Sequence, residues 1–400
     1  MLDVQSLEGV KVLEMGSLIA GPFAGRLMAE NGADVIKVEP PKKGDPLRDW
    51  RHVYEGTSLW WRLQSRNKKS ITVDLKSEEG QEIIKSLIKE CDILIENFRP
   101  GTLEKWNLGY KELSAINPGL VMVRVSGYGQ TGPYRDKPGF GSVGESMGGL
   151  RHLTGYPDQA PTRVGVSLGD SVAAMYAVIG AMMAIYHRDV NGTGKGQVID
   201  VALYEAVFSL LEGALPEFDK VGAIRERTGT SLPGIAPSNT YECNDGKYVV
   251  IGGNGDAIFK RLMEVVGRPE LGEDERYQSN SGRAADADFL DEVIESWTKT
   301  VDFETALEKL DEARVPAGPI YNIEDIVKDP HYLSREMIQK FQLNEEESLK
   351  IPGVVPKMSK TPGETKWLGP ELGQHTDEVM KDWLTYDDKK IAALKAQGVI

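Results

Sequence analysis

Asp170 stands directly before an apolar run, Val172 to Ile185, that is rich in Ala, Val, Ile and Met. The run predicts a buried helix, and it is too short to cross a bilayer, which needs about 20 apolar residues. A carboxylate at a helix N-terminus accepts hydrogen bonds from the N–H groups of the first turn. These groups and the helix dipole also keep it ionised when it is partly desolvated, as a nucleophile requires. Asp170 is therefore predicted as a helix cap or a nucleophile, and the two roles are compatible.

The composition is that of an ordinary globular protein. The chain has 400 residues, of which 40% are hydrophobic and 27% charged, and its length predicts two domains. Cys91 and Cys243 have no CxxC spacing, and none of the five histidines pairs with another at metal-ligand spacing, so neither a disulfide framework nor a metal site is expected. The pattern contains no secretory signal and no membrane span, which predicts a cytoplasmic enzyme.

The net charge is −14, which argues against nucleic-acid binding because that binding depends on Lys and Arg at phosphates. The charge is unevenly distributed, however, and the segment from Lys42 to Lys76 carries nine basic residues and only four acidic ones. We interpret this basic cluster either as a solvated face or as a site for a small polyanion with several phosphates. Its basic members are Lys42, Lys43, Arg48, Arg51, Arg62, Arg66, Lys68, Lys69 and Lys76.

The first half of the chain alternates strands and helices. Residues 9–14, 34–39, 70–75, 92–96, 120–125 and 197–201 read as strands, and residues 22–31, 77–90 and 103–116 as helices, with another helix from residue 202 onward. Such alternation predicts an α/β fold with a parallel sheet, helices on both faces and ligands beyond the carboxyl ends of the strands.

The second half predicts a smaller α+β domain. Residues 229–239 read as a linker, and a hairpin is expected around Asn244-Asp245-Gly246. We place the first part of the large domain at 1–224, the small domain at 225–328 and a strand-poor tail at 329–400. The tail is expected to return to the large domain.

The spacing Gly127-x-Gly129-x-x-Gly132 matches the dinucleotide fingerprint, but a loop and not a helix follows it. Glu39 ends a strand, as ribose-binding acids do, yet the turn after the first strand lacks the glycine spacing. A nicotinamide-dependent dehydrogenase is therefore a weak alternative. The loop of Ser126 to Gly132 is interpreted as a mobile cover for an active site, with backbone N–H groups for developing oxyanions.

Several motifs resemble class III CoA-transferases, the CaiB/BaiF type that includes formyl-CoA and carnitine-CoA transferases. The resemblance runs in order through almost the whole chain. The motifs are Ala20-Gly-Pro-Phe-Ala24, Asn31 to Glu39, Asn67-Lys-Lys-Ser-Ile71, Glu96-Asn-Phe-Arg-Pro-Gly101, Ser126 to Pro133, Gly194-Lys-Gly-Gln197 and Leu372-Gly-Gln-His-Thr376.

The resemblance implies a large Rossmann-like domain with a smaller α+β domain, an interlocked homodimer, no tightly bound cofactor, and an acyl-CoA and a small carboxylic acid as substrates. It implies a nucleophile at Asp170, which forms an aspartyl anhydride and then an aspartyl-CoA thioester. We expect CoA contacts at Ile19, Ala20, Val73, Lys76, Asn97, Phe98, Arg99, Lys105, Lys137 and Phe140.

The chain also departs from the family patterns. Formyl-CoA transferases carry Gln where this chain has Ile19 and Arg where it has Pro40, and their long glycine loop is missing before Tyr241. Related acyl-CoA racemases carry His where this chain has Phe140, and racemisation needs two acid/base groups. A CoA-transferase is thus favoured over an acyl-CoA racemase and a non-catalytic CoA-binding protein.

The residues that select the acyl group and the acceptor are less sharply indicated. Tyr128, Gln130 and Glu145 are substrate-pocket candidates, and Arg48, Arg151 and Arg163 are candidate clamps for the acceptor or ordinary surface arginines. For His375 in the tail a structural role is expected. The sequence names neither the donor nor the acceptor acid.

Overall fold

The computed structural model describes residues 4–400, which divide into two compact units. The larger unit comprises residues up to Leu150, Val164–Glu212 and Ser334–Ile400, and the smaller one Arg151–Arg163 and Gly213–Leu333. Each unit has its own hydrophobic core. The predicted domain limits at 224 and 328 stay a prediction.

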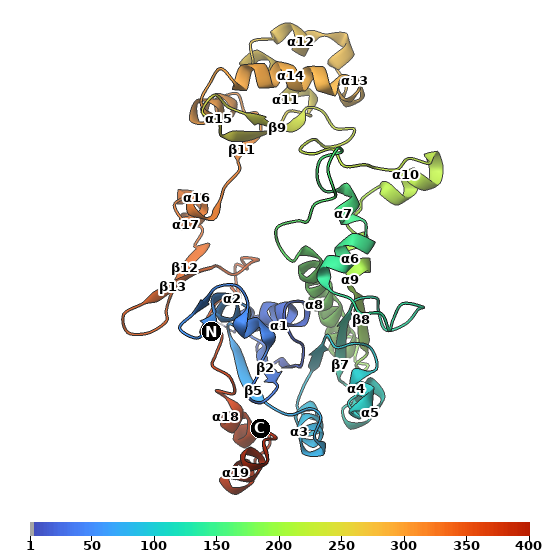
Figure 1. Cartoon of the computed structure of the whole chain (residues 1–400), viewed down its shortest axis with the longest axis vertical. Helices are drawn as coiled ribbons and strands as arrows, with labels where there is room; N and C mark the ends of the chain where they lie inside the picture. Colours follow the sequence, from blue (N-terminus) through green and yellow to red (C-terminus); the bar gives the residue numbers. More distant parts are fainter. Residues whose placement is uncertain (1–3) are drawn as a thin grey trace. The chain divides into compact units, whose positions relative to one another are not determined.

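Within residues 4–400, the larger unit contains a six-stranded parallel sheet in the order β5-β2-β1-β6-β7-β8 (Figure 1). Its strands are β1 (Lys11–Glu14), β2 (Asp34–Glu39), β5 (Lys68–Thr72), β6 (Ile93–Glu96), β7 (Val121–Ser126) and β8 (Val198–Ala202). This is the doubly wound order in which the chain first moves outward from β1 to β5 and then crosses back to β6. The expected α/β class with a Rossmann-like sheet is confirmed.

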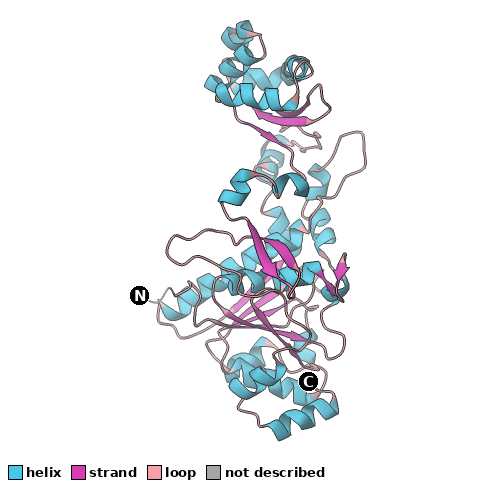
Figure 2. Cartoon of the chain, turned by 90° about the vertical axis from the view of Figure 1, so that its left-hand side faces the viewer, coloured by secondary structure: helices cyan, strands magenta, loops and turns pink. Residues whose placement is uncertain are grey.

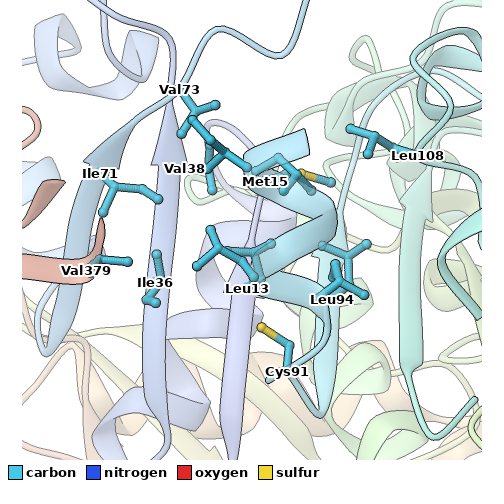
Figure 3. Close-up of a cluster of buried hydrophobic side chains, with 14 of the residues drawn as sticks. Leu13, Met15, Ile36, Val38, Ile71, Val73, Cys91, Leu94, Leu108 and Val379 are labelled. Carbon is cyan, nitrogen blue, oxygen red and sulfur yellow. The ribbon is translucent and has the colours of Figure 1, made fainter. Parts of the chain in front are cut away.

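Helices cover both faces of the sheet (Figure 2). Alternate residues of β1, β2, β6 and β7 enter two separate cores, as Leu13 and Val12 of β1 do. Figure 3 shows the core that Leu13 enters, with Ile36, Ile71 and Leu94 pointing to the same face from neighbouring strands. Helices α3 (Glu78–Ile88), α5 (Tyr110–Ile116), α18 (Thr376–Asp382) and α19 (Asp388–Gln397) supply this core, whereas α1 (Ala20–Glu30) and α8 (Leu168–Asp189) supply the other.

Shorter elements complete the larger unit. They are η1 (Pro46–Asp49), β3 (Val53–Tyr54), β4 (Thr57–Ser58), α2 (Leu59–Gln64), α4 (Thr102–Lys105), α6 (Gly141–Met147), α7 (Leu150–Leu153), which ends beyond the unit's boundary, and α9 (Leu203–Phe208). Two sequence predictions need correction here. The helix expected over 103–116 is broken into α4 and α5, because Asn107 adopts a positive φ of 53° between them. The strand expected over 70–75 begins two residues earlier and ends three residues earlier, at Thr72, so residues 73–75 lie outside the sheet.

Helix α8 is longer than the predicted apolar run and is not buried all round. Over residues 4–400 it alone is long and apolar enough to cross a membrane by length and composition, which corrects the expectation that no segment is. Core helices of globular proteins pass the same test, and one face of α8 packs through Ala173, Ala177 and Ala181 into the sheet's core. The opposite face leaves Ile179, Met183 and other apolar side chains exposed.

The smaller unit is built on an antiparallel sheet in the order β11-β10-β9. The predicted hairpin around Asn244-Asp245-Gly246 joins β9 (Ser238–Glu242) to β10 (Tyr248–Gly252). The other elements of this unit are α10 (Ala214–Val221), α11 (Asp256–Val265), α12 (Pro269–Glu273), η2 (Glu275–Tyr277), α13 (Asn280–Ala285), α14 (Ala287–Thr298), α15 (Phe303–Glu312), β11 (Ala317–Pro319), α16 (Ile323–Ile326) and α17 (Pro330–Ser334), whose last residue belongs to the larger unit.

The tail holds a hairpin that the sequence analysis missed, β12 (Ile338–Gln342) paired with β13 (Ser348–Pro352). Beyond it, the chain runs along β5, where His375 N donates to Ser70 O at 2.9 Å and Asn67 N to Trp367 O at 3.0 Å. Residues from Ser334 onward belong to the larger unit.

Candidate active site

A cavity of about 680 Å³ opens at the carboxyl edge of the parallel sheet. The turns that follow β1, β2, β5 and β6 line it, which places it where the strand order reverses, the usual ligand position in doubly wound sheets. Its volume lies within the range of about 300–1,000 Å³ that small-molecule sites occupy. Among the expected CoA contacts, Val73, Lys76 and Phe98 line this cavity.

The turn after β1 is held from two sides. Asn97 at the end of β6 accepts from Ser17 N at 2.8 Å and donates to Ser17 O at 2.9 Å. Asp45, in the turn after β2, accepts from Leu18 N with both carboxylate oxygens at 3.1 Å. Leu18 adopts a positive φ of 64°, which L-residues avoid unless surrounding contacts hold them there. Asn97, an expected CoA contact, therefore fixes the wall of the cavity.

Beneath the cavity lies a buried charge network that the sequence analysis did not find. Lys37 Nζ lies 3.0 Å from Glu14 Oε1, 2.9 Å from Asp45 Oδ2 and 2.7 Å from Gly16 O. Burial disfavours its ammonium form, but Asp45 and Glu14 outweigh this and the pKa of Lys37 lies above its ordinary value. Burial likewise raises the pKa of Asp45, yet Lys37 and backbone N–H groups hold that pKa below its usual range. Lys68 completes the network with Glu14 Oε2 at 2.7 Å.

The predicted basic cluster is not one surface, so its interpretation is corrected. Arg48, Arg66 and Lys68 are buried and paired with Glu39, Glu30 and Glu14. Arg62 and Lys69 pair with carboxylates elsewhere on the larger unit. Only Lys42, Lys43 and Lys76 line the cavity.

Arg48 is not a surface arginine and is not available to clamp an acceptor. Its guanidinium donates to both oxygens of Glu39 at 2.8 Å and to Pro370 O at 3.1 Å, and it stacks on Trp61 with 3.8 Å to the ring centre. Glu39 resembled a ribose-binding acid in the sequence, but its carboxylate already accepts hydrogen bonds from Arg48, Ser70 Oγ and Asp45 N. The pair ties β2 to the C-terminal segment.

Phe98 and Trp106 form the apolar side of the cavity, with their rings edge to face at 5.4 Å. Glu96 accepts from Phe98 N at 2.7 Å and pairs with Arg124 at 2.7 Å, and Arg124 continues to Glu104 at 2.6 Å. Burial raises the pKa of Glu96 to about 7, although Arg124 opposes the rise. The side chain of Arg124 lowers the pKa of the more exposed Glu104.

Asp170 lies in the first turn of α8, which begins after Ser167, and its carboxylate packs directly against the first residue of α6. A Cβ atom placed on Gly141 would come within 2.1 Å of Asp170 Oδ2, and Cβ atoms do not approach oxygen so closely. Only glycine therefore permits this carboxylate position. The N-termini of two helices converge there and place partial positive charge beside the carboxylate.

Helix α6 presents a face of glycines to its neighbours. A Cβ on Gly144 would meet Leu203 at 2.8 Å, and one on Gly148, directly after the helix, would meet Val207 at 2.7 Å, so α6 lies unusually close to α9. Between them Glu145 is fully buried and its Oε1 accepts from Gly169 N at 3.2 Å. Glu145 thus touches the residue before Asp170 and caps the start of α8.

The loop of Ser126 to Gly132 packs backbone to backbone against Gly139, because a Cβ on Gly127 would lie 2.8 Å from Gly139 Cα. Its N–H groups are partly used: Gly129 N donates to Ser126 Oγ at 3.0 Å and Gln130 N to Asp200 Oδ2 at 2.9 Å. These two do not serve as oxyanion donors in this conformation, which corrects that part of the prediction. Tyr128 forms an aromatic group with neighbouring tyrosines at 5.9 and 6.2 Å.

The other expected contacts are scattered. Ile19 and Ala20 are buried at the start of α1, whereas Arg99 and Lys105 are exposed beyond β6. The ammonium group of Lys137 lies 3.5 Å from the Tyr134 ring centre. Phe140 precedes α6, and 65% of its surface is exposed. Arg151 and Arg163 belong to the smaller unit. His375 Nδ1 accepts from Ser70 N at 3.1 Å, so it connects the C-terminal segment to β5, and its half-burial lowers its pKa.

The sheet order, the two helix layers and the cavity at the switch point place the chain in the class of doubly wound α/β proteins. A solved CaiB/BaiF family protein from Brucella suis superposes with a TM-score of 0.82 at 34% identity, over 95% of this chain and 99% of that one.

The model of CoA-transferase family III matches residues 7–376. The succinyl-CoA–D-citramalate CoA-transferase of Chloroflexus aurantiacus is 50% identical over 98% of both chains, and the beta subunit of its succinyl-CoA–L-malate CoA-transferase is 41% identical over 98% of both. The chain belongs to CoA-transferase family III, and the predicted class of enzyme, an acyl-CoA:carboxylate CoA-transferase, is confirmed.

Proposed function

We propose that this enzyme moves CoA from succinyl-CoA to a hydroxylated dicarboxylic acid, with D-citramalate as the first candidate, and that Asp170 is its nucleophile. The observation that carries the chemistry is the position of Asp170, in the first turn of α8 and against Gly141 of α6. The choice of substrates rests on the 50% identity to a transferase of that name over 98% of both chains.

In the proposed cycle, an Asp170 oxygen attacks the thioester carbon of succinyl-CoA, the C–S bond breaks, and CoA thiolate leaves a mixed anhydride. The thiolate then attacks the aspartyl carbonyl and releases succinate, which leaves an aspartyl-CoA thioester. The acceptor carboxylate displaces the thiolate again, and attack of the thiolate on the acceptor's acyl carbon frees Asp170. Covalent catalysis of this kind replaces one difficult exchange by easier steps with no net proton transfer.

The cavity at the switch point is the proposed place for the nucleotide end of CoA. Phe98 and Trp106 offer an apolar wall, and Lys76 offers a cation without a carboxylate partner among residues 4–400. In this proposal Asn97 shapes the loop beside the ligand and Val73 closes the cavity floor. The remaining expected contacts, including Lys105 and Lys137, stay proposals for the outer part of CoA, and Tyr128, Gln130 and Glu145 for the acyl pocket.

We also propose that the enzyme is a cytoplasmic homodimer. Support for the dimer comes from the exposed apolar face of α8, where Met175, Tyr176, Ile179, Met183 and Tyr186 lie at helical spacing. Exposed apolar patches of this kind mark protein interfaces. Light scattering is expected to give twice the chain mass of 44.1 kDa. An Ile179→Glu/Met183→Glu variant that stays dimeric would contradict this interface.

The function is tested by intact-protein mass spectrometry after mixing with succinyl-CoA, followed by hydroxylamine trapping. The parent protein is expected to carry an acyl or CoA adduct at Asp170, and Asp170→Asn none. Turnover is then compared for D-citramalate, L-malate and oxalate. An adduct on Asp170→Asn would place the nucleophile elsewhere, whereas turnover with oxalate and not with the hydroxy acids would overturn the acceptor class.

A further inference from the structure

Eight of the nine cations of the basic cluster separate into two groups when their partners are traced. The ninth, Arg51, lies over the Trp60 ring at 4.4 Å and does not line the cavity. Arg48, Arg62, Arg66, Lys68 and Lys69 each pair with a carboxylate. Lys42, Lys43 and Lys76 have no side-chain hydrogen bond or ion pair with any of residues 4–400, although Asp45 is only three positions from Lys42 and two from Lys43. All three unpaired lysines line the same cavity. An unpaired group of cations in a cavity indicates an anionic ligand.

Lys42 and Lys43 lie on a turn that is closed by its own backbone hydrogen bonds. Lys43 N donates to Pro41 O at 2.8 Å and Gly44 N to Pro40 O at 3.0 Å, and Lys42 itself adopts a positive φ of 66°. Gly44, also at φ 66°, lets the Arg48 side chain lie against it, because a Cβ there would come within 2.8 Å of Arg48 Cδ.

Buried ion pairs hold both ends of this turn. At its start Glu39 is bound by Arg48, and at its end Asp45 is bound by Lys37 at 2.9 Å. The two lysine side chains are exposed, so their ammonium groups are hydrated and mobile while their backbone is fixed. A fixed backbone reduces the entropy lost when a ligand binds.

We infer that Lys42 and Lys43 bind the 3′-phosphate on the ribose of CoA. This inference rests on the proposed function. A terminal phosphate monoester carries close to two negative charges at neutral pH and three acceptor oxygens, which suits two exposed lysines at neighbouring positions that line one cavity. The diphosphate of CoA, by contrast, is not a terminal group, because the rest of the ligand continues on both sides of it. It is therefore expected to lie further inside the cavity than the 3′-phosphate. Asp49 and Asp74 also line the cavity, and Asp74 Oδ1 is engaged by Lys76 N at 3.0 Å.

The test measures binding of CoA and of 3′-dephospho-CoA by calorimetry to the full chain. The parent protein is expected to bind CoA more tightly than dephospho-CoA. Lys42→Ala/Lys43→Ala is expected to bind CoA at least about tenfold more weakly, with dephospho-CoA affinity unchanged. The KM for succinyl-CoA is expected to rise with the loss of CoA affinity, because the donor carries the same 3′-phosphate.

The matched control is Lys389→Ala/Lys390→Ala, an exposed adjacent pair on α19, which should bind both ligands as the parent does. An equal loss of CoA and dephospho-CoA affinity in Lys42→Ala/Lys43→Ala would assign these lysines to the diphosphate and overturn the inference. The inference would also be overturned if Lys42→Ala/Lys43→Ala still preferred CoA over dephospho-CoA as strongly as the parent protein does. In both cases the proposed transferase survives, whereas a parent that binds neither ligand would contradict both proposals.

Discussion

Two regions of the larger unit position groups by opposite means. The cavity at the sheet edge is held by buried charges, with Lys37, Asp45, Arg48 and Glu39 fixing the turns around it. Asp170 is positioned by close packing of helix backbones, because glycines without side chains let α6 approach α8 and α9 closely. A buried charge network depends on every partner, because removal of one leaves a buried charge unpaired. Glycine packing lets the carboxylate of Asp170 lie against Gly141 but leaves no room there for an added Cβ atom.

The largest expected effect is on the nucleophile. Asp170→Asn keeps the shape of the side chain but removes the attacking oxyanion, so the turnover rate should fall by about 10⁴-fold or more. Steady-state kinetics measure this, with circular dichroism as a check on folding. A fall of less than tenfold would reduce Asp170 to a helix cap.

The next effect is on the charge network. Arg48→Met leaves Glu39 buried without its partner and should lower the free energy of unfolding by about 3–5 kcal/mol. Denaturant unfolding measures it. Arg62→Met is the matched control, because Arg62 binds the same C-terminal segment but pairs with the exposed Glu371, and it should cost no more than about 1 kcal/mol for that pair. Equal stability of Arg48→Met and the parent, with a raised acceptor KM, would restore Arg48 as a clamp.

A pH dependence follows from Glu96, whose pKa burial raises to about 7. Between the ordinary value of 4.5 and about 7, the unfolded chain loses this proton while the folded chain keeps it. The contribution of Glu96 to the free energy of unfolding therefore falls as pH rises through this window, by up to about 3 kcal/mol. Subtracting the Glu96→Gln profile from that of the parent isolates this slope.

Glu104→Gln serves as the control of opposite sign, because the pKa of Glu104 is lowered. Its stabilisation is present above the ordinary pKa of about 4.5 and is lost as pH falls through its lower folded value. Identical slopes for the two variants would contradict the assignment of the raised pKa to Glu96.

The smallest effect tests the glycine packing. Gly141→Ala adds a Cβ within 2.1 Å of Asp170 Oδ2 and must displace the carboxylate, so turnover should fall by about 10–100-fold. Gly165→Ala is the control, since a Cβ there meets nothing within 4 Å. Parent-like kinetics for Gly141→Ala would show that the carboxylate moves freely.

Lys37, a charged residue inside strand β2, indicated a buried ion pair, and the sequence analysis did not use this signal. Lys37 lies among the apolar residues of β2, and a lysine there needs a buried carboxylate partner. The spacing Gly141, Gly144 and Gly148 likewise marks one side of a helix for close packing. Neither pattern identifies the partner residues, because Glu14 and Leu203 lie on other elements, distant in sequence from Lys37 and from the glycines of α6.

The sequence by itself determined the alternation of strands and helices and the position of Asp170 at the start of a helix, because these depend on local patterns of apolar and capping residues. Its motifs, through their resemblance to known proteins, indicated the family. Only the tertiary structure decided which cations of the basic cluster are available. Arg48 is neutralised by Glu39 while Lys42 faces the cavity, since pairing depends on how distant segments meet and not on their order in the chain.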